Sequence, residues 1–281
     1  MPSQLRFLFW LEDSLGLRSS RLNPATKNKT FAVAITLLLS TLISVRAGWT
    51  LQSSTPIETG SPAVTLVRKA VTGDHDVEIH IVFFDICKCD LRVIDHPEEA
   101  GDLEDAMLAN KCLAGVNGNY FHPDRTPLGL VISDGAGVHP LERAKLLSGI
   151  LVSRPGHFSL LRYTEFTPEK STTQALQAGP FFIDKGAAVP GLEATRVADR
   201  TVILSDGKNL GALLVCRSAT LAETAAILAT PGIITEMHIT RALNLDGGSS
   251  TGLWVDALPK PLYISEMKSV RNYLALVPRS R

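Results

Sequence analysis

The stretch Ala242-Leu243-Asn244-Leu245-Asp246-Gly247-Gly248-Ser249-Ser250 places an apolar strand pattern directly before a carboxylate, two glycines and two serines. Glycine lets the backbone turn tightly and approach a ligand closely, and short hydroxyls can donate hydrogen bonds to an anionic or hydroxylated ligand. A strand end that carries an acid beside such a turn is a common place for a binding or catalytic site. Taken alone, the stretch is equally compatible with a well-capped turn that has no chemical role.

Short strands are predicted along most of the chain. Residues 77–86 alternate and then become fully apolar, as a strand entering a core does, and residues 91–95 are expected to be its hairpin partner. Residues 113–120 resemble a buried strand that runs into a turn. Further strands are expected at 149–154 and 158–163, 201–204 and 210–215, 254–257 and 261–264, and 272–277, with Pro155-Gly156 and Asp206-Gly207 as hairpin turns.

Two segments have helical patterns. Residues 98–109 suggest a short amphipathic helix, and Thr220 to Glu223 form a capping box before an Ala/Leu-rich segment that Pro231-Gly232 ends. The sequence therefore predicts an α+β fold: a strand-dominated single domain with a mixed or antiparallel sheet and two or three helices. An all-β barrel or sandwich is the alternative.

The composition is that of an ordinary globular protein. The chain has 281 residues, of which 45% are hydrophobic and 20% charged, and its formal net charge is zero. The net charge of the chain therefore gives no indication of a nucleic-acid partner. Residues 48–62 are polar and are expected to be a flexible lead-in, with the domain spanning residues 63–281.

Residues 1–47 have the layout of an export signal. A basic segment precedes the apolar residues 31–45, and Val45-Arg46-Ala47 is small at the positions a signal peptidase reads. The apolar run is shorter than the roughly 20 residues that a membrane-spanning helix prefers. A cleaved signal peptide, an uncleaved N-terminal anchor and a buried helix are the three interpretations. The first two place residues 48–281 in the periplasm or outside the cell, and the membrane is a partner only through an uncleaved anchor.

The four cysteines do not determine a pairing. Cys87 and Cys89 lie two positions apart in an expected strand, so they would share a face and not bond to each other. With Cys112 and Cys216 they allow three complete pairings, and buried free thiols are the alternative. No second cysteine pair completes a zinc pattern.

Three more segments could carry chemistry. Asn117-Gly118-Asn119 follows a strand, and Asn117 could hold a sugar hydroxyl or orient a carboxylate, while Tyr120 could stack on a sugar. Gly179 before Pro180 could let the backbone pass close to a ligand. Arg200 opens a strand and offers a planar fork to phosphate or carboxylate. The alternatives are a plain Asn-Gly turn with packed aromatic residues, a bulge on an edge strand and a surface arginine.

In order along the chain, NGNYF, QAGPFF, DRTVI, the capped helix and LNLDGGSS resemble the phosphodiester glycosidase family over residues 64–278. Two departures lie where a substrate would approach. Asn119 stands where the family usually has glycine, and Asp246 is followed by two glycines where three are frequent. The resemblance implies a hydrolase that cleaves a glycosyl phosphodiester bond in an exported glycan or glycopolymer.

The resemblance also assigns roles. Cleavage at the anomeric carbon passes through an oxocarbenium-like state, and a phosphate leaving group needs less help from a general acid than an alcohol does. Asp246 would be the catalytic carboxylate and Arg200 the group that binds phosphate. The expected substrate-binding residues are Asn117, Gly118, Asn119, Tyr120, Gly179, Gly247, Gly248, Ser249 and Ser250. A divalent cation near Asp246 is left open, although no ligand spacing points to a metal.

The sequence is compatible with two other functions to different degrees. Residues 248–252 fit the G-x-S-x-G elbow of α/β-hydrolases, but that fold needs a histidine downstream, and His238, the last one, lies upstream. A non-catalytic envelope protein that binds polysaccharide through the same turns is the alternative to a hydrolase.

Overall fold

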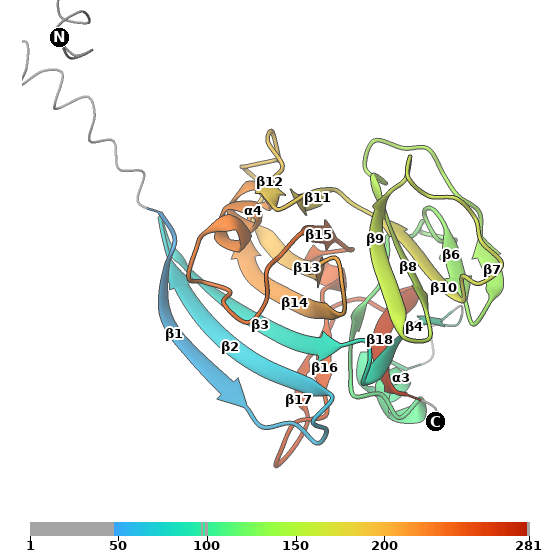
Figure 1. Ribbon diagram of the computed structural model, residues 1–281, viewed down its shortest axis with the longest axis horizontal. Coiled ribbons are helices and arrows are strands. Elements are labelled where there is room, and N and C mark those ends of the chain that lie inside the picture. Colours follow the sequence, from blue (N-terminus) through green and yellow to red (C-terminus); the bar gives the residue numbers. More distant parts are fainter. Residues whose placement is uncertain (1–47, 97, 99–100, 280–281) are drawn as a thin grey trace, which may run out of the picture. The chain divides into compact units, whose positions relative to one another are not determined.

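The computed structural model describes residues 48–279 except 97, 99 and 100. These described residues form one compact unit, drawn in colour in Figure 1. The predicted signal or anchor of residues 1–47 lies outside the described residues. Within the described part of the chain, no helix is long and apolar enough to cross a membrane.

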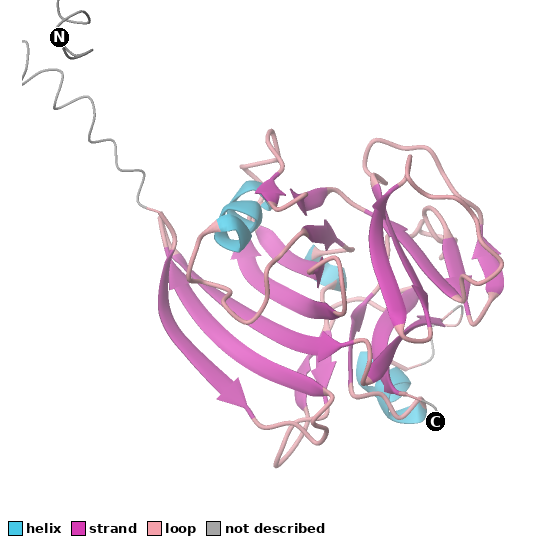
Figure 2. Cartoon of the chain, viewed as in Figure 1, coloured by secondary structure: helices cyan, strands magenta, loops and turns pink. Residues whose placement is uncertain are grey.

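Strands dominate the unit, as Figure 2 shows, and they form three antiparallel sheets. The large sheet has the order β1 (Thr50–Ile57), β2 (Val64–Thr72), β3 (Asp76–Asp85), β14 (Leu210–Ala219), β13 (Ala198–Ser205), β15 (Arg241–Asn244), β11 (Phe181–Asp184), β12 (Ala187–Ala188). The second sheet has the order β17 (Leu262–Ile264), β16 (Leu253–Val255), β5 (Ala114–Asn117), β18 (Asn272–Pro278), β4 (Cys89–Asp95). The third sheet has the order β7 (Ala136–His139), β6 (Val131–Ser133), β10 (Gln174–Ala178), β8 (Gly149–Arg154), β9 (His157–Arg162).

The predicted α+β, strand-dominated fold is confirmed. The expected hairpins β8–β9, β13–β14 and β16–β17 all form, the first two at the turns that Pro155-Gly156 and Asp206-Gly207 predicted. Helix α4 (Leu221–Ala229) begins at the predicted capping box, where Thr220 Oγ1 accepts a hydrogen bond from Glu223 N at 3.1 Å. Helix α3 (Leu103–Ala109) is shorter than expected, because Asp102 caps it by accepting a hydrogen bond from Asp105 N. These local signals work because each depends on residues only a few positions apart.

All three sheets contribute to one shared core. It contains Phe84 and Leu213 from the large sheet, Leu274 from the second and Leu176 from the third. Because strands alternate, β3 also sends apolar side chains to the other face of the large sheet, where α4 packs. A third cluster joins α3 to the outer face of the second sheet.

Two of the expected elements are wrong. Residues 48–62 are not a flexible lead-in, because β1 lies there and pairs with β2 along its length. Most of its side chains are polar and exposed, as in an edge strand, so hydrophobic periodicity gave no signal. Residues 91–95 do not pair with the preceding strand. Both edges of β3 are occupied by β2 and β14, and β4 pairs with β18 in another sheet.

The cysteines are all free thiols. Cys87 is exposed and lies in the turn after β3, so the expectation that it shares a strand face with Cys89 is wrong. Cys89, Cys112 and Cys216 are buried, and burial raises the thiol pKa values to about 12, about 11 and about 12. High pKa values make these three thiols poor nucleophiles.

Candidate active site

The segments predicted to carry chemistry come together where the three sheets meet. Asp246, just after β15, donates its backbone N–H to the carbonyl of Gly118, just after β5, at 3.0 Å. Asn244 donates to the carbonyl of Gly179, just after β10, at 3.1 Å. Thr251 Oγ1 donates to the carbonyl of Asp199, at the start of β13, at 3.3 Å. Four distant parts of the sequence therefore build one site.

Asn117 supports the site from within. It is 1% exposed. Its Nδ2 donates to the carbonyl of Asp246 at 2.8 Å, and its Oδ1 accepts from Thr201 Oγ1 at 2.7 Å and from Gly252 N at 3.2 Å. A buried amide bonded in this way joins β5, β13 and the loop after β15. The structure thus gives Asn117 a supporting place in the site, and its role in positioning substrate or water stays a prediction.

Gly118 and Asn119 are packed against the start of β18. A Cβ atom at Gly118 would lie 1.9 Å from Asn272 Oδ1, so only glycine fits there. Asn119 is 1% exposed and accepts a hydrogen bond from Asn272 Nδ2 at 2.7 Å. Asn119 therefore has a structural role in holding the start of β18, and its contact with substrate stays a prediction.

Tyr120, Gly179 and Asn244 form a polar cluster beside Asp246. Tyr120 donates its hydroxyl to the carbonyl of Gly179 at 2.7 Å and accepts from Asn244 Nδ2 at 2.7 Å. Burial raises the pKa of Tyr120, with a further contribution from the charge of Asp246. Gly179 has φ +152, and a Cβ atom there would lie 2.2 Å from the carbonyl oxygen of Leu146. The backbone at Gly179 therefore passes close to another part of the protein, and its contact with a ligand stays a prediction.

Asp246 is half-buried at the start of the glycine turn. Its Oδ1 accepts from Gly247 N at 2.8 Å, and Ser250 hydrogen-bonds to the same carboxyl. Burial raises the pKa of Asp246, while these hydrogen bonds and the positive charge of Arg196 lower it. The donors hold a single carboxylate in one orientation in a partly dry place, as an acid–base or charge-stabilising group requires.

The turn after Asp246 is shaped by its neighbours. Gly248 has φ +64, and a Cβ atom at Gly247 would lie 2.9 Å from the carbonyl oxygen of Asp199. Ser249 accepts through its carbonyl from Met267 N at 2.9 Å, and Ser250 is 7% exposed. Of the two serines, Ser250 therefore contacts Asp246, and Ser249 holds the loop that contains Met267.

Arg200 lies beside the site with its guanidinium turned toward the backbone. It is 8% exposed, Nε donates to the carbonyl of Ala219 at 2.9 Å, and one Nη donates to the carbonyl of Arg196. Burial lowers its pKa. Asp199, which precedes Arg200 in the chain, pairs with Arg217 on the neighbouring strand at 2.7 Å.

Two site residues were not among those predicted. Asn244 is 3% exposed, and within the described residues its Oδ1 has no hydrogen-bond partner. A polar residue on an otherwise apolar strand was a signal that could have identified it. Arg196 is exposed, and its charge acts on both Asp246 and Tyr120. No local pattern marks Arg196, because the loop before β13 reaches the site only in the folded chain.

No group of three His, Cys, Asp or Glu side chains that could hold a metal ion occurs among residues 48–279 as described. Two surface hollows, of about 230 and about 420 Å³, lie elsewhere. The first is over β8 and β9, and the second is beside β4 and the end of β18. Neither is lined by a predicted site residue.

Comparisons with known proteins agree with this arrangement. A profile described as phosphodiester glycosidase matches residues 110–277, a range that contains every predicted site residue. The zebrafish N-acetylglucosamine-1-phosphodiester alpha-N-acetylglucosaminidase catalytic domain, auto-inhibited by its pro-peptide, has a TM-score of 0.57 at 17% identity, covering 83% of this chain and 89% of that one. No curated protein sequence matches significantly.

Two other solved structures have the same fold. A hypothetical protein from Synechocystis has a TM-score of 0.54 at 16% identity, covering 83% of this chain and 68% of that one. A candidate exported protein from Burkholderia pseudomallei has a TM-score of 0.51 at 13% identity, covering 75% and 74%. At these identities the likeness establishes the fold alone.

Proposed function

The chain belongs to the phosphodiester glycosidase family, and for this reason we propose that it hydrolyses the bond between the anomeric carbon of a sugar and a phosphodiester. The observation that carries the proposal is Asp246, whose half-buried carboxylate accepts hydrogen bonds from Gly247 N and Ser250 where the family motifs meet. The reaction releases a free sugar and a phosphate monoester.

The proposed mechanism uses one carboxylate. As the glycosidic C–O bond breaks, positive charge develops on the sugar and the departing phosphate takes the bonding electrons. The carboxylate of Asp246 stabilises the sugar cation or takes a proton from the attacking water. The phosphate leaves as an anion, so its departure does not depend on a strong general acid. The positive charge of arginine near the start of β13 favours this departure. Tyr120 keeps its proton because its pKa is raised, so its hydroxyl remains a donor.

We further propose that the protein is exported, with residues 1–47 acting as a cleaved signal peptide or an N-terminal anchor. The basic segment, the apolar residues 31–45 and the small residues before Gly48 support export. The fold is shared with a candidate exported protein from Burkholderia pseudomallei. An exported glycan or glycopolymer would then be the substrate.

The test is hydrolysis of simple N-acetylglucosamine-1-phosphodiesters by the purified full-length protein, measured as release of the phosphate monoester. We expect turnover, and Asp246→Asn should lower kcat/KM by about 10²-fold or more, as loss of an acid–base group does. Asp76→Asn, at an exposed position in the β2–β3 hairpin, should leave kcat/KM unchanged. Full activity of Asp246→Asn would contradict the assignment. A folded wild-type protein that binds glycans but turns over none of a panel of sugar phosphodiesters would favour the polysaccharide-binding function.

A further inference from the structure

The loop before β13 is held against the glycine turn of the site. Asp199, near the start of β13, accepts through its carbonyl from Thr251 Oγ1, and this same carbonyl oxygen limits the space at Gly247. Arg196 lies three residues earlier in the loop. The loop that contains Arg196 therefore leads directly to the turn that follows Asp246.

The backbone of Arg196 is fixed on both sides. Its N–H donates to Glu193 Oε1 at 2.7 Å, and its carbonyl accepts from the guanidinium of Arg200. Glu193 Oε1 also accepts from the backbone N–H of Thr195, which tightens the same turn. Because these contacts already fix the backbone of the loop, binding a ligand through the side chain costs little additional backbone entropy.

The two arginines differ in what their guanidinium groups do. Arg200 is buried, and its donors are used on the carbonyls of Ala219 and Arg196. Arg196 is exposed, and its guanidinium has no hydrogen-bond or ion-pair partner among the residues that the structure describes. Its positive charge nonetheless acts on Asp246, Tyr120 and Arg200, which places it in the electrostatic field of the site.

We propose that Arg196 is the residue that binds the phosphate of the substrate, and that Arg200 is a positioning residue that holds Arg196 in place. This inference rests on the proposed hydrolysis of a sugar phosphodiester. A planar guanidinium matches two phosphate oxygens, and a phosphate that gains charge as the C–O bond breaks interacts more strongly with Arg196 in the transition state than in the ground state. The phosphate-binding role first expected of Arg200 therefore passes to its neighbour in the loop.

The test compares Arg196→Ala and Arg200→Ala in the full-length protein, with Arg154→Ala, an exposed arginine at the end of β8, as the matched control. Hydrolysis of an N-acetylglucosamine-1-phosphodiester and binding of methyl phosphate by calorimetry are measured for each. Arg196→Ala should lower kcat/KM by about 10²-fold, as loss of one transition-state donor does. It should also weaken methyl phosphate binding without changing Tm, and Arg154→Ala should change none of these quantities.

Added guanidinium ion separates the two roles. It should restore part of the activity of Arg196→Ala, because the vacated position is open to solvent. It should not rescue Arg200→Ala, whose guanidinium site is buried, and this variant should also have a lower Tm. Arg200→Lys tests the same point with the charge kept. It should remain impaired, because an ammonium does not offer the two-pronged contact to both carbonyls.

Failure of this inference is distinct from failure of the proposed function. If wild type hydrolyses the phosphodiester and Arg196→Ala does so equally well, the inference is overturned and the function stands. If Arg200→Ala alone loses methyl phosphate binding while Tm is unchanged, Arg200 itself binds the phosphate. If wild type turns over no phosphodiester, the function fails, and the loss or retention of methyl phosphate binding in Arg196→Ala still decides the inference.

Discussion

The proposed chemistry depends on the carboxylate of Asp246. Its pKa is raised above the ordinary value of 3.8 because burial disfavours the charged form, and the hydrogen bonds from Gly247 and Ser250 offset this only in part. The folded state is therefore less stable with Asp246 ionised than it would be with a neutral group at the same position. The ionised carboxylate of Asp246 thus lowers the stability of the folded protein.

Asp246→Asn should unfold at a higher temperature than wild type at neutral pH, even though it loses activity. Asparagine is neutral, nearly the same shape and still able to accept from Gly247 N. The difference in Tm should shrink as the pH falls through the raised pKa of Asp246 and vanish below about 3.8, where wild type is protonated in both the folded and the unfolded chain. Thermal unfolding of both proteins from pH 7 to pH 3 measures this. A variant less stable than wild type at pH 7 would show that the hydrogen bonds outweigh burial.

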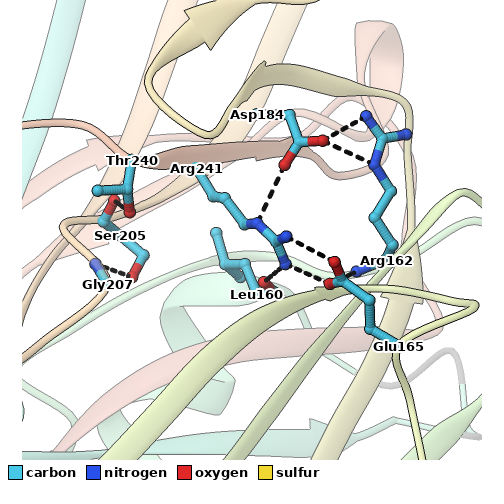
Figure 3. Close-up of polar contacts among 8 residues, drawn as sticks. All are labelled: Leu160, Arg162, Glu165, Asp184, Ser205, Gly207, Thr240 and Arg241. Carbon is cyan, nitrogen blue, oxygen red and sulfur yellow. Dashed lines mark hydrogen bonds and ion pairs between the residues drawn. The ribbon is translucent and has the colours of Figure 1, made fainter.

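Strand β15 carries Asn244 to the site and is anchored at its first residue by a network of charges (Figure 3). Arg241 donates to Glu165 at 2.6 and 2.8 Å and to the carbonyl of Leu160 at 2.6 Å, and it pairs with Asp184 at 3.1 Å. Arg162, at the end of β9, pairs with the same Asp184 at 2.7 Å. The network therefore joins the large sheet to the third sheet at the strand that leads to Asp246.

The network also covers the strand that follows Gly179. The guanidinium groups of Arg162 and Arg241 lie over the ring of Phe181, at 5.0 and 5.8 Å from its centroid. Phe181 is the first residue of β11, two positions after Gly179, and its side chain belongs to the shared core. The charge network and the Phe181 ring therefore hold β15, which leads to Asp246, and β11, which follows Gly179.

Arg241→Met should destabilise the protein by about 2 kcal/mol. Breaking a buried ion pair costs about 3–5 kcal/mol, and the 39% exposure of Glu165 reduces this through solvent screening. Arg92→Met, which removes an ion pair exposed by 36% and 53%, is the matched control and should cost less than about 1 kcal/mol. Chemical denaturation at pH 7 measures both. Equal costs for the two variants would contradict a structural role for the network.

The same comparison has a predicted pH dependence. Arg241 lowers the pKa of Glu165 from 4.5 to about 2, so this carboxylate stabilises the fold above pH 4.5 and the contribution is lost as the pH falls toward 2. The difference in stability between wild type and Arg241→Met should narrow over that interval. The difference in stability between wild type and Arg92→Met should be smaller at every pH in this interval.

At the scale of the whole molecule, the site exists because three sheets share one core. The large sheet supplies β13 and β15, the second sheet supplies β5, and the third supplies β10, whose last residue precedes Gly179. None of these sheets could bury its inner face alone, so the packing that stabilises the unit is also what brings the four strand ends together. The compact unit begins at Gly48, directly after the proposed cleavage position at Ala47.

Export predicts a defined mature terminus. When the full chain is expressed in a bacterial host with a secretion pathway, mass spectrometry of the exported protein should find Gly48 as its first residue if a signal peptide is cleaved after Ala47. Replacing Ala47 with a bulky residue should block cleavage and leave the protein attached to the membrane fraction, with β1 unchanged. Recovery of the unprocessed chain in the cytoplasmic fraction would contradict export, and an intact chain in the membrane of the wild type would show an anchor.

Elements and motifs with local causes can be read from the amino-acid sequence. Turn residues predicted the hairpins β8–β9 and β13–β14, the Thr220 capping box predicted α4, and the ordered motifs predicted the family. The placement of β4 in another sheet than β3, and the formation of the edge strand β1 by a polar segment, follow only from the folded chain. The same holds for the inward turn of Asn117, because its partner Asp246 lies 129 positions away. Hydrogen-bond partners and exclusion of water depend on distant residues, which no pattern of near neighbours encodes.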